Sequence, residues 1–194
     1  AVTQKEIDEL QALLQSGGRP KKELLPLLAV GAVRPWQILA ITFTNKAAGE
    51  LRARLETMLG AADAGEITAS TFHSACVRIL RRDAERLGYP KSFTIYDSDD
   101  SLRAMKEVYK QYNIDDKFLP QKAALSAIGR LKDQMVGPSQ AVAAAGSDHR
   151  AALVATAYEG YAKRLASAGA MDFDDLIYQT VRLLQNHEDV LEYY

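Results

Sequence analysis

Two short apolar runs, each ending in a polar turn that leads into a helical pattern, constrain this chain most. The first run ends in Thr-Phe-Thr-Asn at residues 42–45, and the second ends in Ser-Thr-Phe-His at residues 70–73. Such strand ends place hydroxyl, amide and aromatic side chains at the carboxyl edge of a sheet, where α/β proteins bind ligands. These groups suit a single-stranded nucleic acid, since hydroxyls and helix N-termini bind phosphates and aromatic rings stack on bases. The alternative interpretation is an ordinary βα unit without a ligand.

Hydrophobic periodicity predicts the elements around these two turns. Strands are expected over residues 38–43 and 66–69, and helices over residues 46–59 and 73–87. Gly60 and Gly88 follow the two helices as stop signals. Residues 61–65 are expected to form a loop, and Met58 is expected to face the core.

Downstream the chain turns mainly helical. Asp97 or Ser98 and then Asp172 are expected to cap helices, and Pro120 can begin another. A long helix is predicted over residues 149–166, whereas residues 141–148 are rich in small side chains and are expected to form a loop. The predicted fold class is therefore α/β but predominantly helical.

The N-terminal segment has a different pattern. Thr3 and Glu6 form a capping box ahead of apolar residues at helical spacing, which predicts an amphipathic helix from Thr3 to Gln15 that ends at Gly17. Residues 23–28 are expected to be a second, partly helical piece. The amphipathic helix either packs on its own domain or docks on another protein.

Several segments resemble, in the same order and at similar spacing, DNA helicases of the UvrD, PcrA and Rep type. Residues 38–48 and 69–74 resemble the family's motifs Ia and Ib, and residues 76–82, 93–97 and 171–177 continue the match. The resemblance covers roughly residues 30–194. It implies ATP-driven 3′ to 5′ translocation along single-stranded DNA, with ATP and Mg²⁺ as cofactors of the parent family, in DNA repair and replication in the cytoplasm.

The resemblance also implies a domain organisation. Residues 1–29 lie outside the matching region, and residues 30–96 correspond to a partial RecA-like domain of the P-loop NTPase type. Residues 97–170 correspond to an inserted helical subdomain, and residues 171–194 return to the motor domain.

A phosphate loop of the form Gly-x-x-x-x-Gly-Lys-Ser/Thr is expected ahead of the first strand in this family, because it holds the nucleotide phosphates. The only upstream glycine pair, Gly17-Gly18, has neither the spacing nor the following hydroxyl residue, and the Asp-Glu magnesium motif is also absent. We therefore expect no catalytic, cofactor-binding or metal-binding residues and no ATP hydrolysis by this chain alone. The predicted function is that of a helicase fragment that contributes single-stranded DNA binding. The alternative is a nonenzymatic adaptor or DNA-binding module that retains the fold.

By the resemblance, a set of polar and aromatic residues contacts the DNA: Thr42, Phe43, Thr44, Asn45, Ser70, Thr71, His73, Arg78 and Phe173. Phe43 and Phe173 would contact bases. The alternatives are that Phe43 fills a core and that Ser70 or Thr71 is a plain helix cap. Weaker phosphate-binding candidates are the cations Arg81, Arg82, Arg86, Arg130 and Lys132.

The formal net charge of -1 provides no global attraction to nucleic acid, so any DNA binding must come from local patches. The single cysteine, Cys76, excludes an internal disulfide, and no apolar run is long enough to span a membrane. Two less favoured alternatives are a His73–Cys76 nucleophile and a metal site at residues 172–175. Expected partners are single-stranded DNA, the rest of a helicase or a protein docked through Thr3 to Gln15, and a second copy paired through exposed strand edges.

Overall fold

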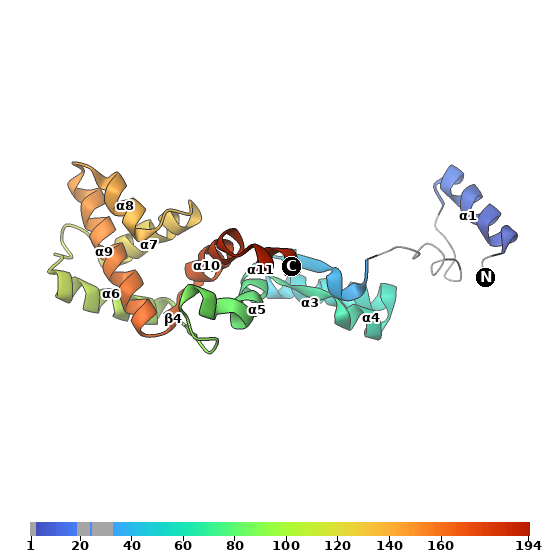
Figure 1. Cartoon of the computed structure of the whole chain (residues 1–194), viewed down its shortest axis with the longest axis horizontal. Coiled ribbons are helices and arrows are strands. Elements are labelled where there is room, and N and C mark those ends of the chain that lie inside the picture. Colours follow the sequence, from blue (N-terminus) through green and yellow to red (C-terminus); the bar gives the residue numbers. More distant parts are fainter. Residues whose placement is uncertain (1–2, 19–23, 25–32) are drawn as a thin grey trace. The chain divides into compact units, whose positions relative to one another are not determined.

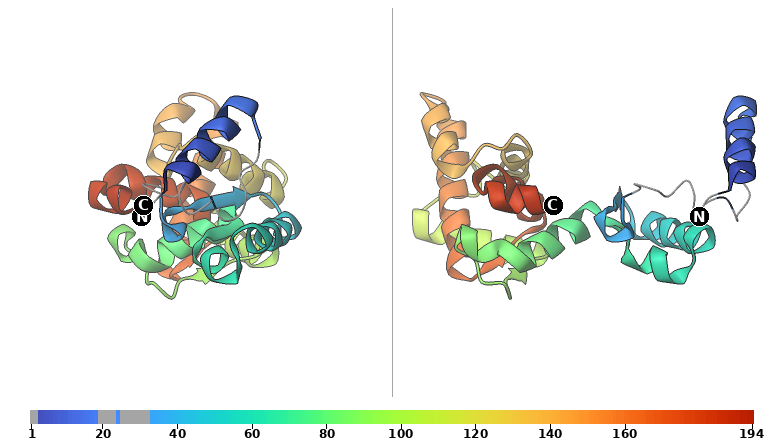
Figure 2. Two further views of the ribbon diagram at one scale, coloured as in Figure 1. Left: turned by 90° about the vertical axis from the view of Figure 1, so that its right-hand side faces the viewer. Right: turned by 45° about the vertical axis from the view of Figure 1, so that its right-hand side comes forward.

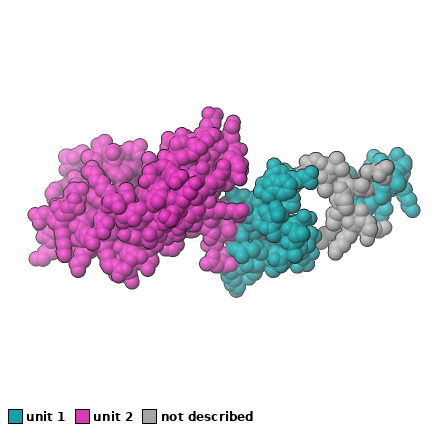
Figure 3. Space-filling model, turned by 60° about the horizontal axis from the view of Figure 1, so that its bottom comes forward, with its two compact units in different colours: residues 1–40, 46–69 teal, residues 41–45, 70–194 magenta. Residues whose placement is uncertain are grey.

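The computed structural model describes residues 3–18, 24 and 33–194. The chain divides into two compact units, which Figure 3 colours separately: unit 1 comprises residues 1–40 and 46–69, and unit 2 comprises residues 41–45 and 70–194. Among the described residues, no helix combines the length and apolar character needed to cross a membrane. The partly helical piece expected over residues 23–28 lies, apart from residue 24, outside the described residues.

The N-terminal helix α1 (Gln4–Ser16) confirms the predicted amphipathic helix (Figure 1). The Thr3 hydroxyl accepts a hydrogen bond from the Glu6 amide, while the Thr3 amide donates to the Glu6 carboxylate at 2.8 Å. The helix ends at Gly17, whose φ of 66° is the left-handed conformation that glycine adopts without steric cost. None of the residues of α1 is buried.

Strands β1 (Leu39–Thr42) and β2 (Thr68–Thr71) form a two-stranded sheet, preceded by a short 3-10 helix, η2 (Pro35–Gln37). Two helices lie between the strands in the sequence, α3 (Asn45–Leu59) and α4 (Ala61–Glu66). The loop expected over residues 61–65 is therefore wrong, because an alanine-rich stretch favours a helix. Met58 is 71% exposed, so its predicted place in the core is also wrong; Ala48 is the buried residue of α3.

Unit 2 holds the remaining elements. They follow in the order α5 (Phe72–Asp83), η3 (Ala84–Leu87), β3 (Thr94–Ile95), α6 (Ser98–Tyr112), α7 (Gln121–Asp133), α8 (Pro138–Ala145), α9 (His149–Ser167), β4 (Ala170–Met171), α10 (Phe173–Asn186) and α11 (Glu188–Tyr193). Asp97 and Asp172 cap α6 and α10 as predicted. The loop expected over residues 141–148 is wrong for residues 141–145, because Pro138 starts α8 in the first helical position and alanines continue it, and right for residues 146–148.

Two apolar cores stabilise unit 2. In the first, α6, α7 and α8 all pack against α9 (Figures 1 and 2), and Met105, Tyr158 and Leu165 are among its fully buried side chains. The second core lies between α5 and α10 and includes Leu80 and Leu176. Unit 2 therefore consists of a helical group, α6–α9, with a core of its own and a second part built around the α5–α10 core.

The short parallel pair β3–β4 links these two parts of unit 2. Thr94 pairs with Ala170 and Ile95 with Met171, and the Tyr96 amide donates to the Met171 carbonyl at 2.8 Å. The chain thus leaves for the helical group from β3 and returns beside the same strand. Because Ala170 and Met171 are completely buried, the start of α10 has a fixed anchor on its N-terminal side.

A buried ion cluster holds the start of α10 from a second direction. We call Lys132, Asp172 and Asp175 the Lys132 cluster. The Lys132 ammonium on α7 lies 2.8 Å and 2.9 Å from the two carboxylate oxygens of Asp172 and 2.9 Å from an oxygen of Asp175. Asp172 also accepts from the Asp175 amide at 2.8 Å, as the N-cap of α10. Lys132 is 4% exposed, so the prediction that it binds DNA phosphates is wrong.

The Lys132 cluster contains one cation for two carboxylates. Burial by itself lowers the pKa of Lys132, but the attraction of Asp175 and Asp172 outweighs burial and raises that pKa. Burial raises the pKa of Asp175 to about 6, and repulsion from Asp172 adds to the rise while Lys132 opposes it. Because one ammonium balances only one carboxylate, uptake of a proton by Asp175 removes the surplus buried charge.

Close packing of α6 on α9 requires a glycine at residue 160. A Cβ atom there would lie 2.7 Å from both Val108 and Tyr112 side-chain atoms. We predict that Gly160→Ala lowers the free energy of unfolding by about 1–3 kcal/mol, because overpacking forces the helices apart. The matched control is Gly49→Ala on α3, where no atom lies within 4 Å; it should raise stability by helix propensity. Urea denaturation followed by circular dichroism measures both, and equal effects would contradict the packing argument.

The surplus charge of the Lys132 cluster predicts a pH dependence. The folded pKa of Asp175, about 6, exceeds its ordinary value of 3.8, so between these values the folded chain binds more protons than the unfolded chain. The free energy of unfolding should therefore rise as the pH falls from 6 toward 4, relative to Asp175→Asn, by about 1–3 kcal/mol. Urea denaturation of both proteins at pH 7 and pH 5 measures this change. A difference between the two proteins that is constant with pH would contradict it.

Candidate nucleic-acid interface

Aromatic side chains gather on the surface of unit 2 at the ends of strands. We call Phe43, Phe72, His73 and Phe173 the aromatic patch. Phe43 is 86% exposed, Phe173 53% and Phe72 41%, and His73 is half-buried. The alternative that Phe43 fills a core is therefore wrong. Exposed aromatic rings that lie together on a surface mark a binding site more often than single exposed residues do.

The rings of the aromatic patch contact one another in pairs. The centroids of Phe43 and Phe72 lie 5.2 Å apart with the rings tilted by 36°. The His73 and Phe173 rings meet edge to face, with centroids 5.7 Å apart and an angle of 69°. Phe72 and His73 are consecutive residues, so both pairs include a residue of the first turn of α5. Such pair contacts order the rings while leaving ring surface open to solvent.

Each member of the aromatic patch lies directly after a strand. Phe43 follows β1, Phe72 and His73 begin α5 after β2, and Phe173 begins α10 after β4. The strands therefore fix the backbone positions from which these side chains project. Phe43, His73 and Phe173 were among the DNA-contacting residues predicted from the sequence, whereas Phe72 was not. The signal was present, since Phe72 lies between two of the predicted contact residues, Thr71 and His73.

The two helix N-termini beside the aromatic patch differ in charge. Asp174 and Asp175 lie in the first turn of α10, with Asp172 as its cap, whereas the first turn of α5 holds no acidic residue. A helix N-terminus carries partial positive charge and attracts anions, but nearby carboxylates repel them. An anionic ligand at the aromatic patch would therefore approach α5 rather than α10.

The predicted hydroxyl and amide contacts occupy different environments. Thr71 is 8% exposed, and its hydroxyl caps α5 by accepting from the Ser74 amide at 3.3 Å. The half-buried Ser70 hydroxyl donates to the Thr71 carbonyl at 3.2 Å. Thr42 is half-buried at the end of β1, while Thr44 and Asn45 are exposed in the turn that starts α3. The turn at residues 44–45 is thus the more accessible of the two polar segments.

Three arginines of α5 and of the following η3 contact neighbouring segments of unit 2. Arg81 lies over the Phe93 ring, 3.9 Å from its centroid, and Arg82 lies 3.3 Å from the centroid of the Tyr193 ring. Arg86 donates to both carboxylate oxygens of Asp189, at 3.0 Å and 2.6 Å. These three guanidinium groups bind within unit 2 instead of forming a free cationic face. Arg78 is exposed on the same helix, nearer the aromatic patch in sequence.

The alternative chemistries find no support at this site. Cys76 is buried, and burial raises the pKa of its thiol, which lowers the fraction of reactive thiolate. Among the described residues, no group of three or more His, Cys, Asp or Glu side chains could hold a metal ion. Gly17 ends α1 and Gly18 follows it, so this pair does not form a nucleotide phosphate cradle.

Comparison with known proteins gives a consistent result. A sequence model described as the UvrD/REP helicase N-terminal domain matches residues 21–194, so the match includes residues 21–29, which sequence analysis placed outside the family. A protein of Staphylococcus epidermidis named ATP-dependent DNA helicase PcrA is 47% identical over 162 residues, which are 84% of this chain and 22% of the relative. A protein of Staphylococcus aureus with the same name is 46% identical over 163 residues, with the same two shares.

This chain spans about a fifth of the length of those relatives. The family match nevertheless covers all of unit 2 and the part of unit 1 from residue 21 on, including every residue of the aromatic patch and of the Lys132 cluster. The resemblance stated from the motifs is thereby confirmed, and the chain belongs to the UvrD/REP helicase family, within its N-terminal domain.

Proposed function

We propose that this chain supplies part of the single-stranded DNA-binding surface of an ATP-dependent DNA helicase. The observation that carries the proposal is the aromatic patch, whose exposed rings offer faces on which unpaired bases stack. Stacking is tolerant of sequence because every base has a π-face, as a translocating protein requires. Membership of the helicase family and the PcrA names of the relatives support the same assignment.

Phosphates are proposed to approach the N-terminus of α5 and the turn at residues 44–45. Thr42, Thr44 and Asn45 and then Ser70, Thr71 and His73 lie at these two positions, and Arg78 adds a cation further along α5. Since the formal charge of the chain is -1, only such a local arrangement favours an anionic strand. The acidic start of α10 would keep phosphates away from Phe173, so that Phe173 contacts a base and not the backbone.

The family's domain organisation is also proposed for this chain. Residues 30–96 and 171–194 belong to a partial RecA-like motor domain, and residues 97–170 form an inserted helical subdomain. Two observations support the insertion: β4 returns beside β3, and the helical group α6–α9 has a core of its own. Binding of ATP and Mg²⁺, hydrolysis, and 3′ to 5′ translocation are proposed for the larger helicase, not for this chain alone.

The nonenzymatic alternative makes two further predictions that stay open to test. One is docking of a protein on Thr3 to Gln15, whose residues are all unburied. The other is pairing of two copies through strand edges. Either becomes the favoured function of the isolated chain if DNA binding is not found.

The DNA assignment predicts the effect of removing a ring from the aromatic patch. Phe43→Ala is expected to weaken binding of a fluorescein-labelled single-stranded oligonucleotide by about 1–3 kcal/mol, or about 5- to 150-fold in Kd, because one base loses its stacking partner. The plot of log Kd against log salt concentration should keep its slope, since the ring carries no charge. Fluorescence anisotropy at two salt concentrations measures both quantities.

Phe118→Ala is the matched control for this experiment. Phe118 is also an exposed phenylalanine of unit 2, at 69%, but it lies between α6 and α7 and outside the aromatic patch. Its removal should leave Kd unchanged. Absence of salt-sensitive binding by the unsubstituted chain, or equal effects of the two substitutions, would contradict the proposed function.

A further inference from the structure

Phe173 is surrounded in the sequence by carboxylates that bind one lysine. Asp172 precedes it and Asp175 follows two residues later, and the Lys132 ammonium contacts both. Lys132 comes from α7, 40 residues earlier in the chain. Phe173 is 53% exposed and its ring contacts the ring of His73, while the carboxylates of Asp172 and Asp175 bind Lys132 of α7.

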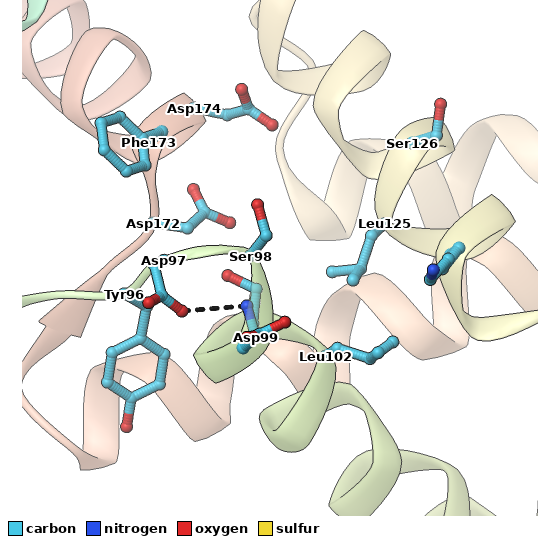
Figure 4. Close-up of a pocket in the computed structure, with 12 residues that line it drawn as sticks. Tyr96, Asp97, Ser98, Asp99, Leu102, Leu125, Ser126, Asp172, Phe173 and Asp174 are labelled. Carbon is cyan, nitrogen blue, oxygen red and sulfur yellow. Dashed lines mark hydrogen bonds between the residues drawn. The ribbon is translucent and has the colours of Figure 1, made fainter.

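Residues of this turn line two pockets. Asp172, Phe173 and Asp174 line a pocket of about 440 Å³ together with Leu125 of α7 and residues at the start of α6 (Figure 4). Lys132 and Asp175 line a second pocket of about 280 Å³. The turn therefore borders two pockets. The turn is held by the β3–β4 pair before it and by the Lys132 cluster within it, and it lies between two buried core residues, Met171 and Leu176.

The contact between α7 and this turn is also close at the backbone. A Cβ atom at Gly129, one helical turn before Lys132, would lie 2.7 Å from a carboxylate oxygen of Asp174. The absence of a side chain at residue 129 lets Asp174 approach α7. Three acidic residues of the turn thus face α7, whereas Phe173 contacts His73 on α5.

We propose that Lys132 is a positioning residue for DNA binding, which fixes the turn of residues 172–175 so that Phe173 is held in the aromatic patch for base stacking. This inference rests on the proposed function, in which Phe173 contacts a base. Lys132 itself does not touch DNA, because its side chain is only 3% exposed. Its influence on DNA must therefore pass through Phe173.

A double-mutant cycle tests this dependence in the full chain. Lys132→Met keeps most of the side-chain volume and removes the ammonium, and it should weaken oligonucleotide binding by a factor no larger than that of Phe173→Ala. When Phe173→Ala is already present, Lys132→Met should change Kd less than twofold. When Phe43→Ala is present instead, Lys132→Met should cost the same factor as in the unsubstituted chain. Kd is measured by fluorescence anisotropy, and folding of each variant by circular dichroism.

A second variant separates positioning from simple electrostatics and guards against unfolding. Lys132→Met leaves buried carboxylates without a counterion, whereas the triple variant Lys132→Met, Asp172→Asn, Asp175→Asn removes all three charges and keeps asparagine as a helix cap. Relative to the unsubstituted chain, the triple variant loses one positive and two negative charges, so general attraction to DNA should rise. Positioning predicts the opposite, weaker binding, because the ion pairs that tie the turn to Lys132 of α7 are then lost. If Lys132→Met does not fold, the triple variant decides alone.

The outcomes are distinguishable. Non-additivity with Phe173→Ala, additivity with Phe43→Ala and weakened binding by the triple variant together support the inference. Additive effects of Lys132→Met and Phe173→Ala, or a triple variant that binds as tightly as the unsubstituted chain or more tightly, would overturn it and leave the proposed function intact. If Phe173→Ala binds normally while Phe43→Ala does not, the inference and the role of Phe173 both fail, but DNA binding at Phe43 stands.

Discussion

The start of α10 depends on one buried ammonium. Lys132 brings a single positive charge to two carboxylates at a turn whose residues line two pockets. Removing one partner of a buried ion pair leaves an uncompensated charge, which typically costs about 3–5 kcal/mol. The helical group α6–α9 and the α5–α10 core are joined at this cluster and at the β3–β4 pair. Both joins lie next to Phe173 in the sequence, so the backbone that carries this exposed ring is held at two places.

The aromatic patch combines fixed backbone with open side chains. Its rings lie one or two residues after β1, β2 and β4, which places them at strand ends, and the three phenylalanines remain exposed. Exposed phenylalanine contributes little to folding, because the ring gains nothing from burial. The rings instead order one another through the Phe43–Phe72 and His73–Phe173 contacts. A surface of this kind can stack on bases without first paying the entropy of collecting its side chains.

Local signals in the sequence predicted local structure well. The Thr3–Glu6 capping box, Asp97 and Asp172 all cap the helices expected of them, because capping is decided within four residues. Residues 61–65 and 141–145 were wrongly predicted as loops, since small residues and glycines obscured short helices favoured by alanine. The Lys132 cluster could not be predicted from sequence, because its members lie 40 residues apart and no local pattern pairs them. Phe72 could have been found, as it shares the strand-end position of Phe43.

Photocrosslinking of a single-stranded oligonucleotide that carries 5-iodouracil at successive positions, followed by mass spectrometry of the peptides, would locate the bases on this chain directly. The iodinated base reacts with aromatic side chains on which it stacks. The proposed interface predicts crosslinks at Phe43, Phe72 or Phe173 that are lost at high salt together with binding. Crosslinks confined to the helical group, for example at Phe118 or Tyr112, would contradict the assignment of the aromatic patch as the DNA-binding surface.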